Sequence, residues 1–398
     1  MLFIHTKWNG YRVVSSGQTD GTQKKHMYLM ETPDNEIHYF SIVNSLMVAL
    51  FLTCTVAIIM LRALKKDIAD YNDMNDIAAV EESGWKLLHG DVFRPPAKGR
   101  ALLSVAVATG MQIGTRVSLT LIASTLRLIH PMKKGQFLTS VVIFYVLSGS
   151  VAGFTSARVY KVFQGKAWKR TTFLTAVAFP GVLVGMFILL NCFLAYRGAA
   201  TAVSFVTILK IFALWVCVST PLVFMGSFFG YRREKIAVPV KTDQIARFMP
   251  WLLKVPHSAL LGGILPFGSL SVELSFIMGA LWLHQIYYIM GFVLVVALIL
   301  TLSCATVSIV ICYCQLCSED YKWWWKSFFN TDSTVLYLFC YSLWYLMMKL
   351  ELVGILPFMV YLTYKGMIAL AVGLWCGAVG MLSSLWFCRK IYGAVKVD

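Results

Sequence analysis

Charged residues are scarce in this chain. Asp, Glu, Lys and Arg together make up 14% of its 398 residues, whereas hydrophobic residues make up 58%. A soluble domain averages about 25% charged and about 45–50% apolar residues. The composition therefore excludes an ordinary soluble domain and predicts an integral membrane protein.

Acidic residues are the scarcer of the two charged classes, with 19 Asp and Glu against 35 Lys and Arg, a net charge of +16. No basic cluster is interleaved with polar residues in the way that would follow a chain of phosphates, so we expect no nucleic-acid partner. Cytoplasmic loops of membrane proteins carry surplus Lys and Arg. The positive charge is therefore read as a signal of topology.

Catalytic motifs are also absent. The sequence has no nucleophile–base arrangement, no HExxH pair, no phosphate-binding loop and no nucleotide fingerprint. We expect neither an enzyme nor a bound cofactor. The ten cysteines lie almost entirely in or beside apolar runs, so a disulfide framework is not expected and most should be small core residues.

Long apolar runs make up most of the chain. A membrane-spanning helix needs about 20 mainly apolar residues, and nine runs meet that length. Backbone groups in hydrocarbon must be satisfied within the segment, which predicts helices, and the alternating strands of a barrel are missing. The predicted fold is an all-α polytopic membrane protein, a bundle of nine transmembrane helices. The runs are 40–61, 101–126, 137–157, 172–195, 203–229, 258–281, 287–313, 333–351 and 357–388.

Lysine and arginine divide unevenly between the two sides of this bundle. With the N-terminus outside, the inner segments hold 23 of them and the outer segments hold 9. This bias predicts an exterior N-terminus and a cytosolic C-terminus. We expect residues 1–37 to be a short exterior segment, the remnant of a larger domain, because they are too few for a core. Residues 38–398 form the membrane domain, with a cytosolic loop at 62–100 and a cytosolic tail at 389–398.

Three charged residues fall within the predicted spans: Arg116, Lys210 and Glu273. Charges at this depth are costly and often functional. Glu273 follows GGILPFGSL (262–270), where Pro266 and the glycines weaken the helix. A broken helix followed by a carboxylate is typical of transporter sites, so proton-coupled transport through Glu273 is one hypothesis. A structural ion pair or a carboxylate in a wet vestibule is the other interpretation.

Glycines recur at fourfold spacing in five of the runs, which lets another helix backbone approach closely. These glycines either pack the nine helices together or form exposed faces that receive helices of other membrane proteins. The motifs are GMQIG (110–114), GSVAG (149–153), GVLVG (181–185), GSFFG (226–230) and GLWCGAVG (373–380).

The stretch CYCQLCSEDYKWWWKSFF (312–329) lies at the predicted cytosolic edge of the seventh span. Cys312, Cys314 and Cys317 lack a fourth metal ligand nearby, so we expect no metal and treat them as candidate palmitoylation sites. The three tryptophans at 323–325 are predicted to form an interfacial aromatic belt.

The stretch EESGWKLLHGDVFRPP (81–96) is unusually polar for this chain. His89 and Asp91 are two weak ligands and do not make a metal site. Glycines permit turns, and Pro95 and Pro96 favour an extended approach to the second span. We expect a shaped cytosolic loop, packed against helix ends, with Trp85 at the membrane interface.

Five stretches together make the chain similar to the nonaspanins, the transmembrane nine superfamily, from about residue 37 onward. They are IHYFSIVNS (37–45), EESGWKLLHGDVFRPP (81–96), GGILPFG (262–268), LWLHQIYYIMGF (281–292) and QLCSEDYKWWWKSF (315–328). As the signature residues of the loop we take Gly84, Trp85, His89, Gly90, Asp91, Arg94 and Pro95.

The resemblance implies a multi-pass protein of Golgi and endosomal membranes, with a lumenal N-terminus and a cytosolic C-terminus. It implies a non-enzymatic role in sorting and localising other transmembrane proteins, whose helices would be recognised through a helix face. It also implies that Lys396, Val397 and Asp398 form a signal for the COPI coat, since a lysine and two carboxylates make a compact charged tag. The expected partners are membrane lipids, cargo proteins and this coat. A proton-coupled or lipid-handling transporter using Glu273 is the alternative.

Overall fold

The computed structural model describes residues 84–129, 134–198, 203–240, 262–268, 286–349 and 354–394, with scattered residues between 47 and 69. The described part of the chain is helical and contains no strand. A short 3-10 helix, η1 (Gly84–Leu88), comes first. It is followed by α3 (Arg100–Thr125), α4 (Lys134–Val162), α5 (Trp168–Tyr196), α6 (Phe205–Leu214), the π-helical turn η2 (Trp215–Ser219), α7 (Thr220–Arg232), α9 (Ile286–Cys317), α10 (Trp323–Asp332), α11 (Thr334–Lys349) and α12 (Ile355–Ala394). The all-α prediction is confirmed.

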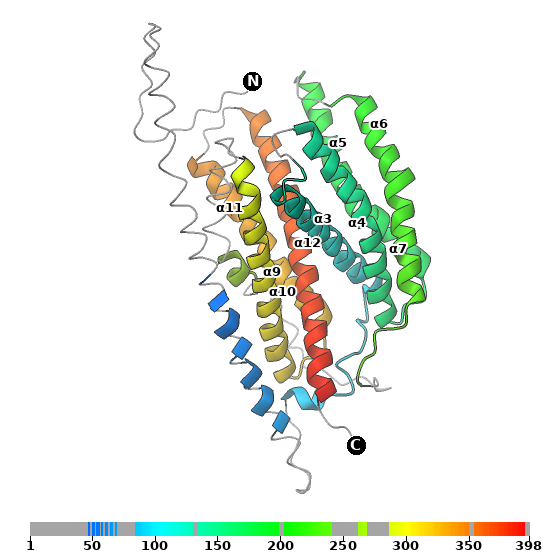
Figure 1. The fold of residues 1–398 in the computed structure, drawn as a ribbon, viewed down its shortest axis with the longest axis vertical. Coiled ribbons are helices and arrows are strands. Elements are labelled where there is room, and N and C mark those ends of the chain that lie inside the picture. The colour runs from blue at the N-terminus through cyan, green and yellow to red at the C-terminus, as the bar shows by residue number, and fades with distance from the viewer. Residues whose placement is uncertain are drawn as a thin grey trace.

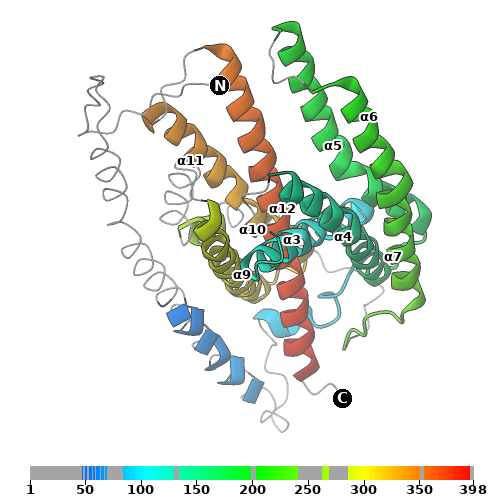
Figure 2. The same ribbon diagram turned by 45° about the horizontal axis from the view of Figure 1, so that its top comes forward.

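Helix α12 is the central element of the bundle, and it contacts α3, α5, α9, α10 and α11. Figure 1 shows α9, α10 and α11 on one side of α12 and α3, α4 and α7 on the other. Helices α5 and α6 run side by side at the outer edge in both Figure 1 and Figure 2. Because α6 buries none of its ten residues, it forms an outer surface of the described bundle.

Glycines set the closest helix contacts. A Cβ added at Gly110 of α3 would lie 2.0 Å from the carbonyl oxygen of Leu374 in α12, and one at Gly153 of α4 would lie 2.0 Å from that of Val223 in α7. Carbon and oxygen cannot approach so closely, so only glycine allows these backbones to meet. The packing interpretation therefore holds for the glycines of α3, α4, α7 and α12.

Helix α5 contains Pro180, which removes one of its backbone hydrogen bonds. Proline has no N–H, so the carbonyl four residues earlier, that of Ala176, loses its helical partner. The indole Nε1 of Trp215 in η2 donates to that Ala176 oxygen at 3.1 Å. This bond satisfies the carbonyl and fixes the irregular turn of the α6–α7 span against α5.

Six helical segments are long and apolar enough to cross a membrane: 100–125, 135–162, 168–196, 205–232, 290–317 and 355–394. They match six of the nine predicted runs, so the described residues support a polytopic protein without showing nine spans. The run at 333–351 corresponds to α11, which has only 16 residues and follows α10 almost without a break. The runs at 40–61 and 258–281 lie mostly outside the described residues.

The main apolar core lies at one end of the bundle, called the loop end here, where α4, α7, α9 and α12 finish and α3 begins. Helix α12 has 40 residues, about 60 Å at 1.5 Å per residue, which exceeds the roughly 30 Å of a bilayer core. Its last turns, including Ile391 and Tyr392, are buried against η1 and the residues after it. The described part of this polar sequence, residues 84–96, therefore belongs to a packed end of the bundle.

Candidate functional site

The signature loop, residues 84–98, folds into a compact structure at the loop end. It begins as η1 and continues in turns held by the Asp91 and Val92 amides, which both donate to the Leu88 carbonyl at 2.9 Å. Trp85, Leu88 and Val92 are at most 3% exposed. The expectation that the loop packs against helix ends is confirmed. Trp85 lies inside this packing, so its predicted place at the membrane interface was wrong.

Three consecutive indoles hold this loop from the start of α10. Trp323 donates from Nε1 to the Val92 carbonyl at 2.8 Å. Trp324 donates to the Arg94 carbonyl at 2.9 Å, and Trp325 donates to the Lys98 carbonyl at 3.3 Å. We call this set of bonds the tryptophan clamp.

The tryptophan clamp corrects the predicted aromatic belt. Trp323 and Trp324 are 0% and 2% exposed, and their rings stack with centroids 3.9 Å apart. A belt residue keeps its polar edge in the wet headgroup layer. Here the polar edges meet buried carbonyls instead, because residues some 230 positions earlier in the chain supply those acceptors.

Helix α12 completes the enclosure of the loop. The Tyr392 hydroxyl donates to the Trp85 carbonyl at 2.7 Å, and the two rings meet edge to face with centroids 5.5 Å apart. The His89 ring lies 6.2 Å from the same tyrosine ring. Signature loop, α10 and the end of α12 therefore form one unit.

Two ion pairs lie within this unit. Arg94 forms an ion pair with Asp91 at 2.5 Å, and Lys326 of α10 pairs with Asp320. Burial raises the pKa of Tyr321. The nearby charges of Asp91 and Asp320 raise it further, whereas that of Arg94 lowers it. Among the described residues, no group of three His, Cys, Asp or Glu side chains could hold a metal ion.

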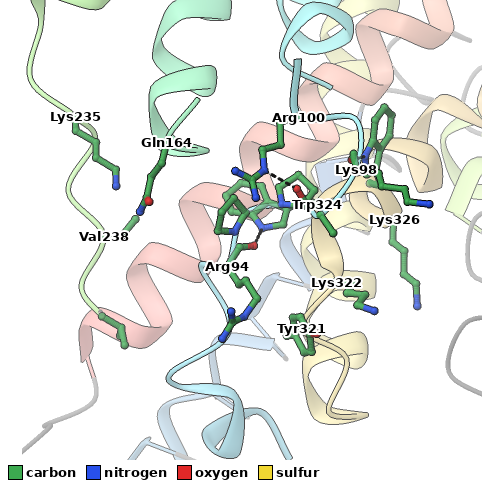
Figure 3. Close-up of a pocket in the computed structure, with 15 residues that line it drawn as sticks. Arg94, Lys98, Arg100, Gln164, Lys235, Val238, Tyr321, Lys322, Trp324 and Lys326 are labelled. Atoms are coloured by element: carbon green, nitrogen blue, oxygen red, sulfur yellow. Dashed lines mark hydrogen bonds between the residues drawn. The ribbon is translucent and has the colours of Figure 1, made fainter. Parts of the chain in front are cut away.

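A cavity of about 1180 Å³ opens beside this unit. Its described lining comes from the signature loop with Arg100, from Gln164 just after α4, from the segment after α7, and from residues 321–326 at the start of α10. Figure 3 shows Lys235 and Gln164 on one side, with Arg94, Arg100 and the α10 residues on the other. Six cationic side chains and no acidic one line it within the described structure: Arg94, Lys98, Arg100, Lys235, Lys322 and Lys326.

The segment after α7 (233–240) forms the far wall, and cations from two other helices hold its backbone. Lys161 of α4 donates to the carbonyl of Arg233 at 2.6 Å, and Arg389 of α12 donates to that of Ala237 at 2.9 Å. Arg158 donates to the carbonyl of Glu234. These bonds place Lys235 across the cavity from the signature loop.

Sequence reasoning identified the signature loop, including Arg94 and Pro95 of the lining. It missed the cavity, whose cations come from segments far apart in the chain. The available signal was the Lys and Arg surplus in the predicted cytosolic segments. That surplus indicates a side of the membrane and does not show that the side chains converge.

The intramembrane charges are separate from this cavity in the described structure. Arg116 of α3 lies over the Tyr145 ring of α4, with its Cζ 5.4 Å from the ring centroid, a cation–π contact that accommodates the charge between helices. Lys210 is exposed in the middle of α6, within the first turns of the 205–232 span, where its long stem can reach the interface. Glu273 lies outside the described residues.

The candidate modification sites divide by exposure. Cys312 is buried, with its sulfur 3.8 Å from that of Cys388, whereas Cys314 and Cys317 are exposed. Acylation therefore stays a prediction for the two exposed thiols and is sterically blocked at Cys312 in this fold. The coat signal, residues 396–398, lies outside the described residues.

One glycine pair remains open. A Cβ at Gly185 of α5 would meet nothing within 4 Å, and one at Gly181 would meet only the Val177 side chain, at 3.9 Å. The neighbouring Val182 and Leu189 are 51% and 73% exposed. Among the described glycine motifs, this α5 face is the one left uncovered by the bundle.

Comparison with known proteins gives a consistent result. Residues 10–355 match the family described as endomembrane protein 70. Transmembrane 9 superfamily member 9 of Arabidopsis thaliana is 44% identical over 369 residues, which cover 92% of this chain and 57% of the relative. Transmembrane 9 superfamily member 2 of Homo sapiens is 42% identical over 376 residues, with 93% and 57% covered. The chain thus spans 57% of the length of these curated relatives. No solved structure matches it.

Proposed function

This chain belongs to the endomembrane protein 70 family, the transmembrane 9 superfamily, and from that premise we propose that it is a non-enzymatic trafficking factor of the Golgi and endosomes. It would aid the sorting and membrane localisation of other transmembrane proteins. The observation that carries the proposal is the open Gly181–Gly185 face of α5. The exterior N-terminus and cytosolic C-terminus remain part of the proposal, supported by the bias of Lys and Arg.

The physical argument is close approach. Association between helices in a bilayer relies on van der Waals packing and polar contacts, since lipid tails are as apolar as the side chains. Glycines four residues apart give a flat strip on which a second backbone can lie. The bond from Trp215 to Ala176 holds α5 one turn before this strip, so the face is presented by a fixed segment.

The experiment is recovery of a model cargo, a single-span protein with a glycine-rich, polar helix, by affinity purification of this chain from detergent. Gly181→Leu with Gly185→Leu should reduce recovery at least about fivefold, because two leucine side chains would block the close backbone approach that small residues allow. Gly135→Leu is the matched control, since this exposed glycine also has nothing within 4 Å of an added Cβ. Undiminished recovery with the α5 double variant would refute the helix-face mechanism.

Polar contacts to cargo helices are a second part of the proposal. Arg116 is already engaged by Tyr145, whereas Lys210 is exposed on α6 and has no partner among the described residues. Glu273→Leu and Lys210→Leu should each weaken recovery of a polar cargo helix more than that of a purely apolar one. Equal effects on both cargoes would argue against specific polar recognition.

The C-terminal residues Lys396, Val397 and Asp398 are proposed to bind the COPI coat. Helix α12 ends at Ala394, so the tag would follow the membrane domain almost directly. Lys396→Ser should move the protein out of the Golgi in fluorescence images, with Lys390→Ser as the matched loss of one nearby lysine. Golgi residence in the Lys396 variant would reject the signal.

A second function, proton-coupled or lipid-handling transport, is favoured by one observation. The Asn330 side chain is fully buried, and neither its nitrogen nor its oxygen has a hydrogen-bond partner in the described part of the chain. The backbone carbonyl and the Cβ of Asn330 lie against Gly262, in the GGILPFG segment that precedes Glu273. A pH-driven flux in proteoliposomes that Glu273→Gln abolishes would establish transport, and no flux in the wild type would exclude it.

A further inference from the structure

The cavity at the loop end holds an excess of positive charge. Of its six cations, Arg94 and Lys326 are paired with Asp91 and Asp320. The other four, Lys98, Arg100, Lys235 and Lys322, have no carboxylate partner within the described structure. Like charges lining one space repel one another unless an anion lies between them. The uncompensated charge is therefore itself a reason to expect an anionic occupant.

The cavity walls are built before any ligand arrives. On one side the tryptophan clamp fixes the backbone of the signature loop up to Lys98, and Arg100 donates to the Pro96 carbonyl at 2.8 Å. On the other side α4 and α12 hold the segment that carries Lys235. The backbone that carries Lys98 and Lys235 is therefore fixed before binding, which lowers the entropy cost of forming the site.

The position and size of the cavity indicate which class of anion it would bind. It lies where the apolar segments ending at 162, 232 and 317 finish, and the ends of membrane-spanning segments lie next to the headgroup layer. Its volume of about 1180 Å³ slightly exceeds the roughly 300–1,000 Å³ of small-molecule sites. Basic pockets between helices at a cytoplasmic surface suit phosphorylated lipid headgroups, and lysine and arginine bind phosphate by charge-assisted bonds.

We propose that this cavity binds a multiply phosphorylated inositol headgroup, presented by a phosphoinositide of the adjoining leaflet. Phosphates would pair with Lys98, Lys235 and Lys322. Trp325 lines the same cavity, is partly exposed and would contact the apolar edge of the inositol ring. The protein would then read the lipid identity of its membrane at this site.

The test uses the full chain in neutral detergent and measures the change of its tryptophan fluorescence during titration. The lipid probe is dioctanoyl phosphatidylinositol bisphosphate, and the matching soluble headgroup is inositol trisphosphate. Dioctanoyl phosphatidylserine controls for a single negative charge, and a poly-glutamate peptide represents an acidic protein partner. Tighter binding of the lipid than of inositol trisphosphate assigns the source to the membrane, while equal binding of the two assigns it to a soluble inositol phosphate.

The variant Lys98→Gln, Lys235→Gln, Lys322→Gln removes three cavity charges. It leaves the Lys98 carbonyl in place for Trp325, because that bond uses the backbone. The control is Lys166→Gln, Lys169→Gln, Arg170→Gln, which removes three exposed cations outside the cavity lining and close to the end of α4.

Affinity for the phosphoinositide should fall at least about tenfold in the cavity variant and less than about twofold in the control, as expected for lost charge-assisted contacts. Both variants should elute as the wild type does in size exclusion. Three outcomes would overturn the proposal: no binding of either phosphorylated inositol probe to the wild type, equal loss in the two triple variants, or tighter binding of poly-glutamate or phosphatidylserine.

Discussion

Replacing Trp323 by phenylalanine tests the central packing claim of the loop end. The substitution keeps an aromatic ring but removes the N–H that donates to the Val92 carbonyl at 2.8 Å. Both residues are 0% exposed, so water cannot easily take the place of the lost donor. An unsatisfied buried carbonyl costs about 1–3 kcal/mol, and the smaller ring adds a cavity cost in the same direction.

The loss should appear as easier opening of the signature loop. A decrease of about 1–3 kcal/mol in opening free energy raises amide exchange roughly 5- to 150-fold. Hydrogen–deuterium exchange of the detergent-solubilised protein, followed by mass spectrometry of peptides from 84–98, measures this directly. Peptides from α5 and α6 should change little, because no residue of these helices belongs to the core that contains the clamp tryptophans.

Trp386→Phe is the matched control, since this tryptophan of α12 is 57% exposed. It should leave loop exchange unchanged. If Trp323→Phe also left the exchange of 84–98 unchanged, the clamp would be refuted. If both variants in addition altered the partition of the protein into lipid, Trp323 and Trp386 would both be acting as interfacial residues.

Gly153→Leu should abolish monodisperse expression of a fluorescent fusion, because its side chain would begin 2.0 Å from a backbone oxygen of α7; a normal size-exclusion profile would contradict this packing. Tyr392→Phe should lower unfolding free energy by about 1–3 kcal/mol, since the phenol donates at 2.7 Å to a buried loop carbonyl; an unchanged thermal midpoint in detergent would count against it. Cys314→Ser with Cys317→Ser should lose alkyne-palmitate labelling, whereas Cys312→Ser should retain it because Cys312 is buried. Labelling that depends on Cys312 would show that this end opens.

The helices could be predicted because their signal is local. An apolar run of sufficient length must satisfy its backbone internally in lipid, and α3, α4, α5, α9 and α12 all fall on predicted runs. Glycine spacing also marked the faces on which close helix contact is possible. It could not say which faces are covered, because the covering residue is on another helix: Leu374 covers Gly110, while nothing covers Gly185.

Only part of the candidate site could be predicted, because the rest depends on residues from distant parts of the chain. The signature loop stood out by composition, and its packing against helix ends was expected, but the burial of Trp85 was not. The roles of Trp323 and Lys235 depend on partners more than a hundred residues away. An indole has one apolar body and one donor, so the same WWW stretch suits either a wet interface or a buried carbonyl. Only the fold decides between them.

The clamp and the cavity are coupled, because the loop that the indoles hold also carries Lys98 into the cavity wall. A ligand that binds only the closed loop stabilises it by RT ln(1 + [L]/Kd), about 2.7 kcal/mol at a hundredfold excess over Kd. That figure is comparable to the cost of losing one indole bond. A phosphoinositide at this excess should therefore restore slow exchange to the signature loop of Trp323→Phe. It should give no such protection to that variant when the three cavity lysines are also glutamine. Protection in both would place the lipid elsewhere on the bundle, whereas protection of the first alone would tie the packed loop and the anion site into one structure.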